Sequence, residues 1–393
     1  MSKQTRWFVW LVSTPLVALV MVGGVIGEPR AAAVTGQQGL DHLPVFTDVL
    51  RLVIGAYVED VNIDKVMDGA MRGMTEGLDI SSAFLLPDEV RAIETTAAPP
   101  AGDVGLVVVH GFWLRVLGVR DGSPAARAGL QSGDYVRAID TRPTRDMSGL
   151  TGMRLLRGVP GSKVSVTVIR GNTTDPHVFE LVREAPKANL VTTTMTDGVA
   201  RVRVSSFSAG TADALRAAFD ELARNKTPGA VIDLRGVADG TPDDGMKAAR
   251  LFVKTGTIAV RAGRTPGLMK ITAGAGDGAI SLPVVLLVSN GTANAAEVFA
   301  AALQGNKRAE MVGEPTAGVA ALQKLVKLTQ GYGLWLTYER YMTVDGKTPI
   351  HERGLAPDVP IGNPIVGFDE LPPTTDAPLA KAVERVKAQV GAK

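Results

Sequence analysis

The sequence contains no cysteine among its 393 residues. This absence excludes disulfide bonds, a thiolate nucleophile and any metal site with cysteine ligands. Histidine is also scarce. The four histidines, His42, His110, His177 and His351, are far apart and form no pair at i, i+4 spacing. We therefore expect surface or loop histidines, and neither a metal ion nor another cofactor.

A strong excess of charge of one sign is also missing. The 42 basic and 40 acidic side chains leave a formal net charge of +2, and the two signs are interleaved along the chain. A nucleic-acid-binding protein needs a basic stripe or patch. Nucleic acid is therefore not expected as a partner. The length corresponds to two or three domains of ordinary size.

One long apolar run is present, near the N-terminus. Residues 7–27, WFVWLVSTPLVALVMVGGVIG, are uncharged and mostly apolar, and about 20 such residues cross a bilayer as a helix. Because Lys3 and Arg6 precede the run, the positive-inside rule places the rest of the chain on the extracytoplasmic side. We expect residues 1–35 to hold an uncleaved membrane anchor. A signal peptide cleaved near residues 31–33 is the alternative.

The residue pattern of the remaining chain changes three times. Residues 36–95 carry apolar residues at helical spacing, as in FTDVLRLVIGAYV, which predicts a small helical region. After a Pro-containing linker, TTAAPPAGD, residues 100–185 hold short β-branched stretches separated by Gly, Pro and Asp turns. This pattern predicts a small, mostly-β domain.

From residue 187 to residue 365, strands such as AVIDLRG alternate with amphipathic helices such as TADALRAAFDELARN. The alternation predicts an α/β layer with parallel strands. Residues 366–393 form a Pro-rich break followed by a short basic helix. The expected fold class is α+β and multidomain, with an N-terminal membrane helix, a helical segment, a β domain and an α/β core.

Several stretches together are characteristic of one family. They are AYVEDVNIDKVMDGAMRGMTEGLD, DGSPAARAGLQSGDYVRAID, RGVPGSKVSVTVIRG, VRVSSFSAGTADALRAAFDEL, AVIDLRG, VSNGTANAAEVFAAALQGNKRAEMVGEPTAG and RGLAPDVPI. In this order and approximate spacing, the chain resembles the C-terminal processing peptidases, also called tail-specific proteases. The resemblance implies a PDZ domain at residues 100–185 and a protease-like core at residues 187–365.

The resemblance also implies a serine nucleophile and a lysine general base, and this chain has neither. The family's S-A-S-A-S-E pattern reads TANAAE here, which keeps Ala295 and Glu297 but puts Asn294 at the nucleophile position. The family's T-F-G-K-G-x-x-Q pattern reads TAGVAALQ, which keeps Gln323 but puts Val319 at the base position. Covalent catalysis needs an attackable oxygen and a base to take its proton. Both halves of the mechanism are missing.

A third departure lies in the turn after DLR. In the family an Asn-Pro-Gly-Gly turn contributes backbone groups to the oxyanion site, whereas this chain reads DLRGVADG, with Asp239 and Gly240 at the glycine positions. A carboxylate at Asp239 is expected to oppose the negative charge that such a site must stabilise.

We interpret Asn294 as a helix cap. Asparagine is a favoured N-cap residue, and Glu297 three positions later can reach back as in a capping box. The alternative is a relocated catalytic pair, with Thr292 or Ser289 as nucleophile and Lys307 or Lys324 as base. On a strand, however, Lys324 would point away from the face that carries Gln323.

The PDZ-like region retains its expected chemistry. In such domains an extended peptide adds to a sheet edge, and its terminal carboxylate is caught by backbone N–H groups of a glycine-containing loop. An apolar pocket beside the loop favours tails that end in apolar residues. The alternative is that these side chains are only domain core. The expected peptide-binding residues are Val104, Gly105, Leu106, Val107, Val108 and Leu155.

These observations predict a membrane-anchored, extracytoplasmic pseudoprotease that binds the C-terminal tails of other proteins as a scaffold or regulator. The alternative function is an active serine-type endopeptidase that uses a non-standard nucleophile and base. We also expect weak peptide binding in the former catalytic cleft, between Asp233 and Gln323. The helical segment Leu43–Leu78 is expected to support a homo-oligomer, or a hetero-oligomer with a related protease.

Overall fold

The computed structural model describes residues 40–95, 100–171, 175–186, 190–368, 370–371 and 373–391. The predicted anchor, residues 7–27, lies outside the described residues, as does part of the predicted linker. Within the described ranges, no helix combines the length and the apolar character that a bilayer crossing requires. The chain forms two compact units, one up to Ala70 and the other from Met71 onward.

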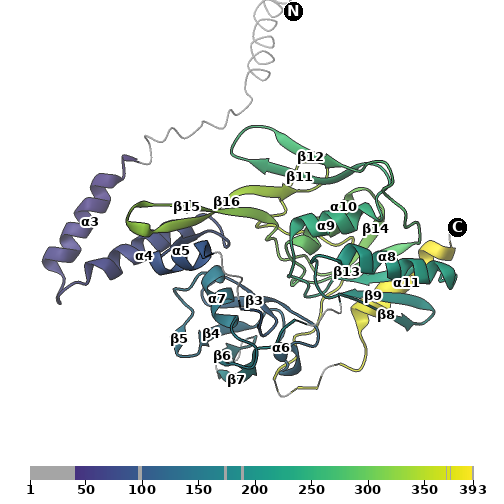
Figure 1. Cartoon of the computed structure of the whole chain (residues 1–393), viewed down its shortest axis with the longest axis horizontal. Helices are drawn as coiled ribbons and strands as arrows, with labels where there is room; N and C mark the ends of the chain where they lie inside the picture. The colour runs from purple at the N-terminus through teal and green to yellow at the C-terminus, as the bar shows by residue number, and fades with distance from the viewer. Residues whose placement is uncertain are drawn as a thin grey trace, which may run out of the picture. The chain divides into compact units, whose positions relative to one another are not determined.

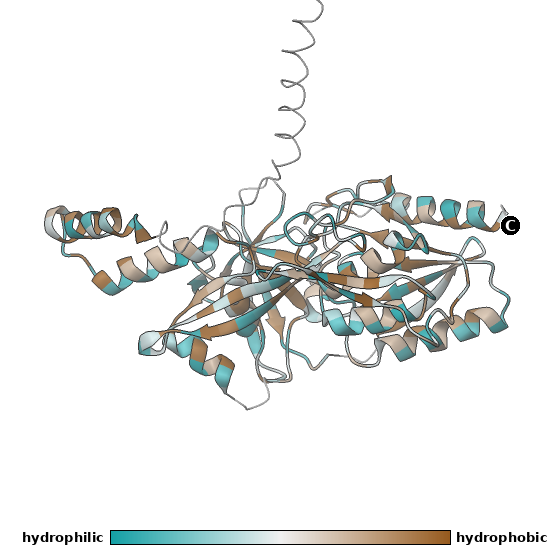
Figure 2. Ribbon diagram, turned by 90° about the horizontal axis from the view of Figure 1, so that it is seen from above, coloured by the Kyte–Doolittle hydropathy of each residue, from teal (hydrophilic) through white to brown (hydrophobic). Residues whose placement is uncertain are grey.

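Helix α3 (Leu43–Ala56) in the first unit leaves its apolar residues uncovered. It has Pro44 in its first turn, where the missing N–H costs nothing, and none of its residues is buried. Val45, Val49, Leu52 and Ile54 are each more than half exposed. Figure 2 shows the apolar residues along this helix. Helix α4 (Ile63–Glu76) follows and continues into the second unit.

The predicted β domain is a six-stranded antiparallel sheet in the order β2-β3-β4-β6-β7, with β5 paired to β4 (Figure 1). Alternate residues point inward, so Val164, Val166 and Val168 of one strand enter the core. Serines at two helix starts accept a backbone N–H as N-caps. The elements are β2 (Leu106–Val109), β3 (Leu114–Val119), α6 (Pro124–Arg127), β4 (Tyr135–Ile139), β5 (Arg142–Pro143), α7 (Gly149–Leu156), β6 (Lys163–Ile169) and β7 (His177–Val182).

The predicted α/β layer is a second six-stranded sheet, in the order β17-β14-β13-β10-β9-β8. All neighbours pair in parallel except β8 with β9. The continuous apolar runs of the central strands are buried on both faces, as parallel sheets require. The strands are β8 (Val191–Thr196), β9 (Val199–Val204), β10 (Ala230–Asp233), β13 (Val284–Val288), β14 (Ala309–Gly313) and β17 (Val359–Pro360).

Helices cover both faces of this sheet. One face packs against α8 (Thr211–Arg224), α9 (Pro242–Arg250) and α10 (Ala295–Gly305). The other face packs against α11 (Ala377–Gly391), whose Leu379, Ala382, Val383 and Val386 contact alternate strand residues. The helix predicted in the segment 366–393 is therefore part of the core layer and not a free tail.

A third sheet was not predicted. Its strands are antiparallel, and the long β16 pairs with β15 along one edge. Its other edge pairs with β1 at one end and with β11 at the other, and β11 also pairs with β12. The elements are β1 (Ala83–Leu85), α5 (Pro87–Glu94), β11 (Thr257–Gly263), β12 (Leu268–Thr272), β15 (Ala321–Lys327), η1 (Thr329–Gly331) and β16 (Gly333–Met342).

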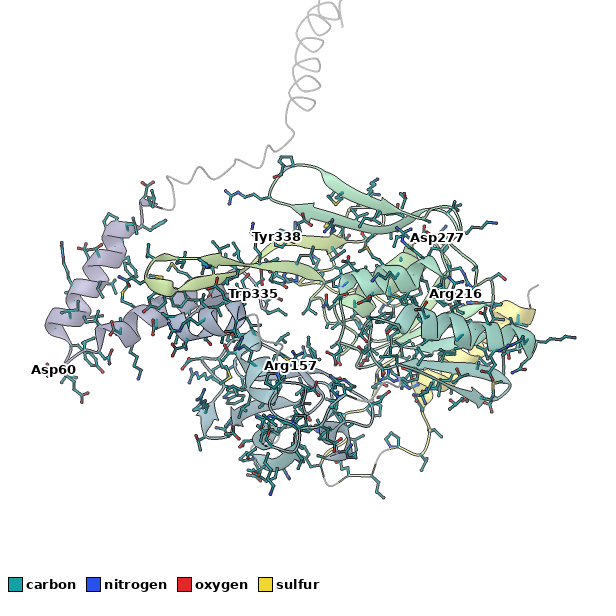
Figure 3. All side chains as sticks on the ribbon, in the orientation of Figure 1. Asp60, Arg157, Arg216, Asp277, Trp335 and Tyr338 are labelled. Atoms are coloured by element: carbon teal, nitrogen blue, oxygen red, sulfur yellow. The ribbon has the colours of Figure 1, made fainter. Side chains whose placement is uncertain are left out.

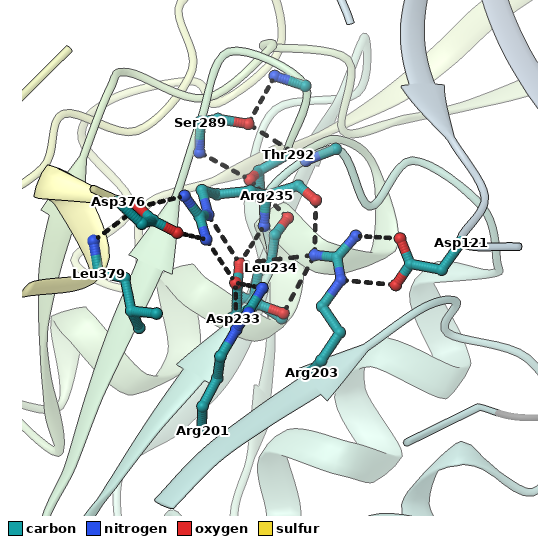
Figure 4. A network of polar contacts seen from close by, with 12 residues as sticks. Asp121, Arg201, Arg203, Asp233, Leu234, Arg235, Ser289, Thr292, Asp376 and Leu379 are labelled. Carbon is teal, nitrogen blue, oxygen red and sulfur yellow. Dashed lines mark hydrogen bonds and ion pairs between the residues drawn. The ribbon is translucent and has the colours of Figure 1, made fainter. Parts of the chain in front are cut away.

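An ionic network at the end of β10 connects these layers (Figure 4). Asp233 is fully buried and accepts hydrogen bonds from Arg201 at 2.7 Å and Arg235 at 2.8 Å. Arg235 continues to Asp376 at 2.8 Å, just before α11. Asp233 thus fixes the sheet to its flanking segments and does not line a cleft with Gln323, which corrects the expected position of the cleft.

The network also sets the protonation of Asp233. Burial by itself would raise the pKa, but the hydrogen bond from Arg235 and the positive charges of the neighbouring arginines outweigh it and lower the pKa to about 2. A lowered folded-state pKa means that the carboxylate stabilises the fold above its unfolded pKa near 4 and loses this contribution as the pH falls toward 2.

We predict that the free energy of unfolding depends on pH in this range. Between pH 5 and pH 2 the free energy of unfolding should fall by about 2 kcal/mol through Asp233 alone. Asp233→Asn should lower stability at pH 7 by about 3 kcal/mol, because buried arginines lose their counter-charge, and should remove that part of the pH dependence. Urea titrations at several pH values measure both effects. Asp220→Asn, on the exposed side of α8, is the control and should change neither.

Candidate functional site

The turn between β13 and α10 has the geometry of a strained strand-to-helix elbow. Asn294 lies immediately before α10 with φ 49° and ψ −109°, a conformation that residues other than glycine rarely adopt. Such an elbow presents a nucleophile at the top of a sheet in hydrolases. The turn is fixed by the Thr292 hydroxyl, which donates to Leu234 O at 2.8 Å. The geometry persists although the residue is asparagine.

Glu297 connects the elbow to the segment that carries Val319. Its carboxylate is fully buried. Oε2 accepts from the backbone N–H of Asn294 at 3.0 Å and of Val319 at 2.9 Å. Oε1 accepts from Gly318 N–H at 2.7 Å and from the Thr316 hydroxyl at 2.6 Å. Burial raises the pKa of Glu297, and these four hydrogen bonds act in the opposite direction. One side chain therefore holds in place both positions at which the resemblance expects a nucleophile and a base.

The side chain of Asn294 does not cap the helix as predicted. Glu297 closes its half of the capping box, but the Asn294 side chain makes no capping hydrogen bond. Instead Nδ2 donates to Gly240 O at 3.3 Å, and Oδ1 is buried without a hydrogen-bond partner. A buried acceptor without a partner costs about 1–3 kcal/mol. The residue therefore retains both backbone strain and an unsatisfied oxygen.

Val319 leaves the base position apolar. It is buried and packs with Leu117, Ala238 and Ala293 in a small apolar cluster. Leu117 belongs to β3, so the PDZ domain supplies one side of this cluster. A valine side chain accepts no proton, and nothing else in the cluster does so.

A cavity of about 330 Å³ opens beside these residues. It is lined by the start of β1, by β2 and α7 of the PDZ domain, and by the elbow region. None of the lining residues is ionisable. They are Ile80, Ser81, Ser82, Ala83, Val107, Val108, Val109, Leu117, Ser148, Gly149, Leu150, Met153, Ala238, Asn294, Val319, Ala321, Gln323 and Trp335.

The other predicted site residues lie around this cavity in different roles. Gln323 lines it and donates to the Thr337 hydroxyl at 3.3 Å. Ala295, the first residue of α10, is fully buried. Gly240 has φ 120°, and a Cβ there would lie 1.9 Å from Phe207 O. Only glycine fits this part of the turn.

The carboxylate of Asp239 is paired with an arginine and is not a free negative charge at the oxyanion site. Its Oδ2 accepts from Arg120 Nη2 at 2.6 Å, and Arg120 Nη1 donates to Asp103 at 2.8 Å. Arg120 follows β3, so this guanidinium joins the PDZ loop at Asp103 to the turn after β10. The expected repulsion is therefore reduced by an ion pair. Sequence reasoning missed Arg120, because no local pattern signals a contact between residues so distant along the chain.

The relocated catalytic pair is not assembled. The Thr292 hydroxyl is committed to Leu234 O, and the Ser289 oxygen accepts from two backbone N–H groups. Lys324 lines a different cavity from Gln323, as alternation along β15 predicts. Lys307 follows the end of α10 and is exposed.

The predicted carboxylate loop precedes an edge strand. Gly105 has φ 80°, and a Cβ there would lie 2.3 Å from the Ser123 hydroxyl, so the loop requires glycine. Strand β2 pairs only with β3 among the described strands, which leaves its other edge facing α7. On that edge Val108 N–H donates to Met153 Sδ at 3.3 Å.

The predicted peptide-binding side chains divide into two groups. Val104, Leu106 and Val108 are buried in the PDZ core, and Leu155 packs against it half-buried. Val107 is only partly buried and lines the cavity beside the elbow. Val107, Val108 and Val109 of β2 line the cavity, and Leu106 belongs to the core only.

We predict that Asn294→Gly stabilises the chain. Glycine adopts the positive φ without strain, and the substitution also removes the unsatisfied oxygen. After subtraction of the greater unfolded-state entropy of glycine, the free energy of unfolding should rise by about 1 kcal/mol. Thermal unfolding measures this. Asn225→Gly is the control, since Asn225 has φ −81° and its replacement should slightly destabilise. A lower midpoint for Asn294→Gly would contradict the strain argument.

Comparisons with known proteins agree with this architecture. Residues 198–361 match the model of peptidase family S41, and residues 115–170 match that of a PDZ domain. The carboxyl-terminal-processing protease of Synechocystis sp. is 30% identical over 413 residues, covering 98% of this chain and 94% of that protein. The carboxy-terminal processing protease CtpA of Bacillus subtilis is 26% identical over 367 residues, covering 91% and 78%.

A solved structure is similar over the same region. The photosystem II D1 C-terminal processing protease matches with a TM-score of 0.67 and 28% identity, covering 84% of this chain and 95% of that one. The mixed α/β architecture with a PDZ domain and a protease core, the order of the motifs and the near-complete coverage of a relative lead to one conclusion. The chain belongs to the carboxyl-terminal processing proteases of peptidase family S41.

Proposed function

We propose that this chain is a family member that binds protein tails without cleaving them, as a membrane-anchored, extracytoplasmic scaffold or regulator. The observation that carries the proposal is the pair Asn294 and Val319, both held by Glu297 at the elbow and on the adjoining segment. A carboxamide oxygen is a poor nucleophile, and valine has no basic atom. The scaffold of the site is kept while its chemistry is absent.

The alternative is an active peptidase that uses other residues. Ser82 is the strongest candidate for its nucleophile. Its hydroxyl lines the cavity and donates to Asp79 Oδ2 at 3.0 Å, and His351 Nε2 lies 3.7 Å from the same oxygen. In a catalytic triad the imidazole lies between the hydroxyl and the acid. Here the carboxylate lies between them, so the order is wrong for proton transfer through histidine.

Asp79 is also too weak a base. Burial acts to raise its pKa, but the neighbouring His351 imidazole and the hydrogen bonds from Ser81 and Ser82 outweigh this effect and hold the pKa well below its usual range. A general base works best when its pKa is near the working pH. This arrangement therefore favours a structural role for Ser82, at the turn before β1.

Tail binding is supported by the PDZ domain. The glycine-requiring loop at Gly105, the free edge of β2 and the helix α7 beside it are the elements that peptide addition to a sheet edge uses. The uncharged cavity continues from this groove to the elbow, because residues of β2, α7 and the protease-like core line it together. A bound tail can thus extend toward Asn294 without meeting a charged side chain.

We include association with a second copy or with a related protease in the proposal. The uncovered apolar side chains of α3 support it, since a helix with no buried residue gains free energy when a partner covers it. Sedimentation of the full-length chain at rising concentration tests this point. The membrane anchor at residues 7–27 remains a prediction from the sequence.

We predict that the full-length chain leaves a partly unfolded reporter with an apolar C-terminus intact, as followed by mass spectrometry. The comparison proteins are Asn294→Ser combined with Val319→Lys, and Ser82→Ala. Cleavage by the natural chain would overturn the proposal, and its loss in Ser82→Ala would identify the nucleophile. Cleavage by the double variant alone would show that the site lacks only these two side chains.

We predict that the chain binds a fluorescent peptide that ends in apolar residues and a free carboxylate more tightly than the same peptide with an amidated end. Met153→Asp should weaken binding by about tenfold, because it places a charge in the groove beside Val108. Arg154→Asp on the same helix is exposed and should change affinity little. Equal affinities for the free and amidated peptides would remove carboxylate recognition from the proposal.

A further inference from the structure

The third sheet is split along one edge of β16. Gly333–Trp335 pair with β1, and Glu339–Met342 pair with β11. Between them, Leu336, Thr337 and Tyr338 have β15 on one side and no strand on the other. Figure 3 labels Trp335 and Tyr338, which lie along this strand. The backbone N–H of Thr337 donates to Ser82 Oγ at 3.2 Å. The side chains around the split, more than the sheet edge itself, are therefore available to a ligand.

A groove of about 1060 Å³ occupies the split. Its walls are the turn before β1, the β11–β12 hairpin, and the exposed sides of β15 and β16. We call it the hairpin groove. It is lined by Leu78, Asp79, Ser82, Arg261, Gly263, Arg264, Thr265, Pro266, Gly267, Leu268, Met269, Lys324, Leu336, Thr337, Tyr338 and Glu339.

The two acids of the groove are already engaged. Glu339 pairs with Arg261 at 3.2 Å. Asp79 accepts from the backbone N–H groups of Ser81 and Ser82. Neither carboxylate is therefore free to neutralise the remaining cations of the groove.

Two cations of the groove remain for a ligand. Arg264, near the tip of the hairpin, and Lys324, on β15, are both exposed. Among the described residues, neither forms an ion pair with an acidic side chain. Lys324 lies over the ring of Tyr338, 5.2 Å from its centre, which holds the ammonium group at the wall of the groove.

Exposed apolar side chains line the same groove. Leu268 is 45% exposed, Met269 is 53% exposed and Tyr338 is 39% exposed. Leu78, also in the lining, is 55% exposed. A ligand that covers these side chains removes apolar area from water, while its own anionic groups meet Arg264 and Lys324.

We propose that the hairpin groove binds an extended peptide segment of another protein in which acidic and apolar residues alternate. An extended chain places alternate side chains on opposite faces, so one face can cover Leu268 and Met269 while the acids reach the cations at the rim. This site differs from the PDZ groove and shares only Ser82 with the lining of the cavity at Asn294. It needs no free C-terminal carboxylate.

The probe is an acetylated, C-terminally amidated peptide, Asp-Leu-Asp-Leu-Asp, labelled for fluorescence polarisation. It is titrated with the full-length chain in a non-ionic detergent. Binding is expected, and the variant R264E/K324E should weaken it by about tenfold. The control R216E/R224E makes the same change in net charge on exposed positions of α8 and should leave affinity within about twofold, with thermal unfolding unchanged in both variants.

Two further peptides test the chemistry of the ligand. Replacing aspartate by lysine should abolish binding, and replacing leucine by serine should weaken it. Equal binding of the lysine peptide, or an equal loss in R216E/R224E, would overturn the proposal. It would also be overturned if the chain dimerises and R264E/K324E dissociates the dimer, because the occupant would then be a second copy.

Discussion

The buried carboxylate of Glu297 is the constraint on which the site depends. A carboxylate removed from water is very costly unless hydrogen bonds replace its hydration. Here four donors do so, three of them backbone N–H groups from the elbow and from the segment around Val319. These donors are available only when both segments take the positions that catalysis would have required. The arrangement therefore persists for reasons of stability, independently of the side chains at positions 294 and 319.

The residues that fix the backbone of the site thus differ from the residues at the nucleophile and base positions. Gly240, Thr292 and Glu297 fix the backbone through close approaches and hydrogen bonds that do not use the side chains of Asn294 and Val319. The remaining free-energy costs are confined to Asn294. Asn294 keeps a positive φ and an oxygen without a partner, which are the features that active sites usually retain for function. Their persistence without a nucleophile is what favours a binding role for the cavity.

Much of the fold follows from the sequence. The alternation of strands with helices predicted parallel pairing for β10 and β13, and the amphipathic period predicted α8. The motif spacing located Asn294, Val319 and Gln323, all of which line one cavity. These predictions succeed because they depend on residues that are close in sequence or on patterns with a fixed period.

The failures concern contacts between distant segments. Arg120 with Asp239, and Asp233 with its arginines, involve charges whose partners cannot be chosen from an interleaved sequence. The third sheet was missed because β16 pairs with strands that lie more than two hundred residues apart along the chain, β1 and β15. The predicted helix cap at Asn294 failed for a different reason. The side chain of Asn294 is directed toward Gly240, to whose carbonyl its Nδ2 donates.

The uncharged lining of the cavity at Asn294 has a thermodynamic consequence. With valine at position 319, a ligand there would gain free energy mainly from apolar area, and burial of such area gives a negative heat-capacity change. Association at that position would depend weakly on ionic strength. The cations of the hairpin groove have the opposite property, since added salt screens exposed charges. A change in ionic strength would therefore alter binding in the hairpin groove and leave binding in the cavity at Asn294 nearly unchanged.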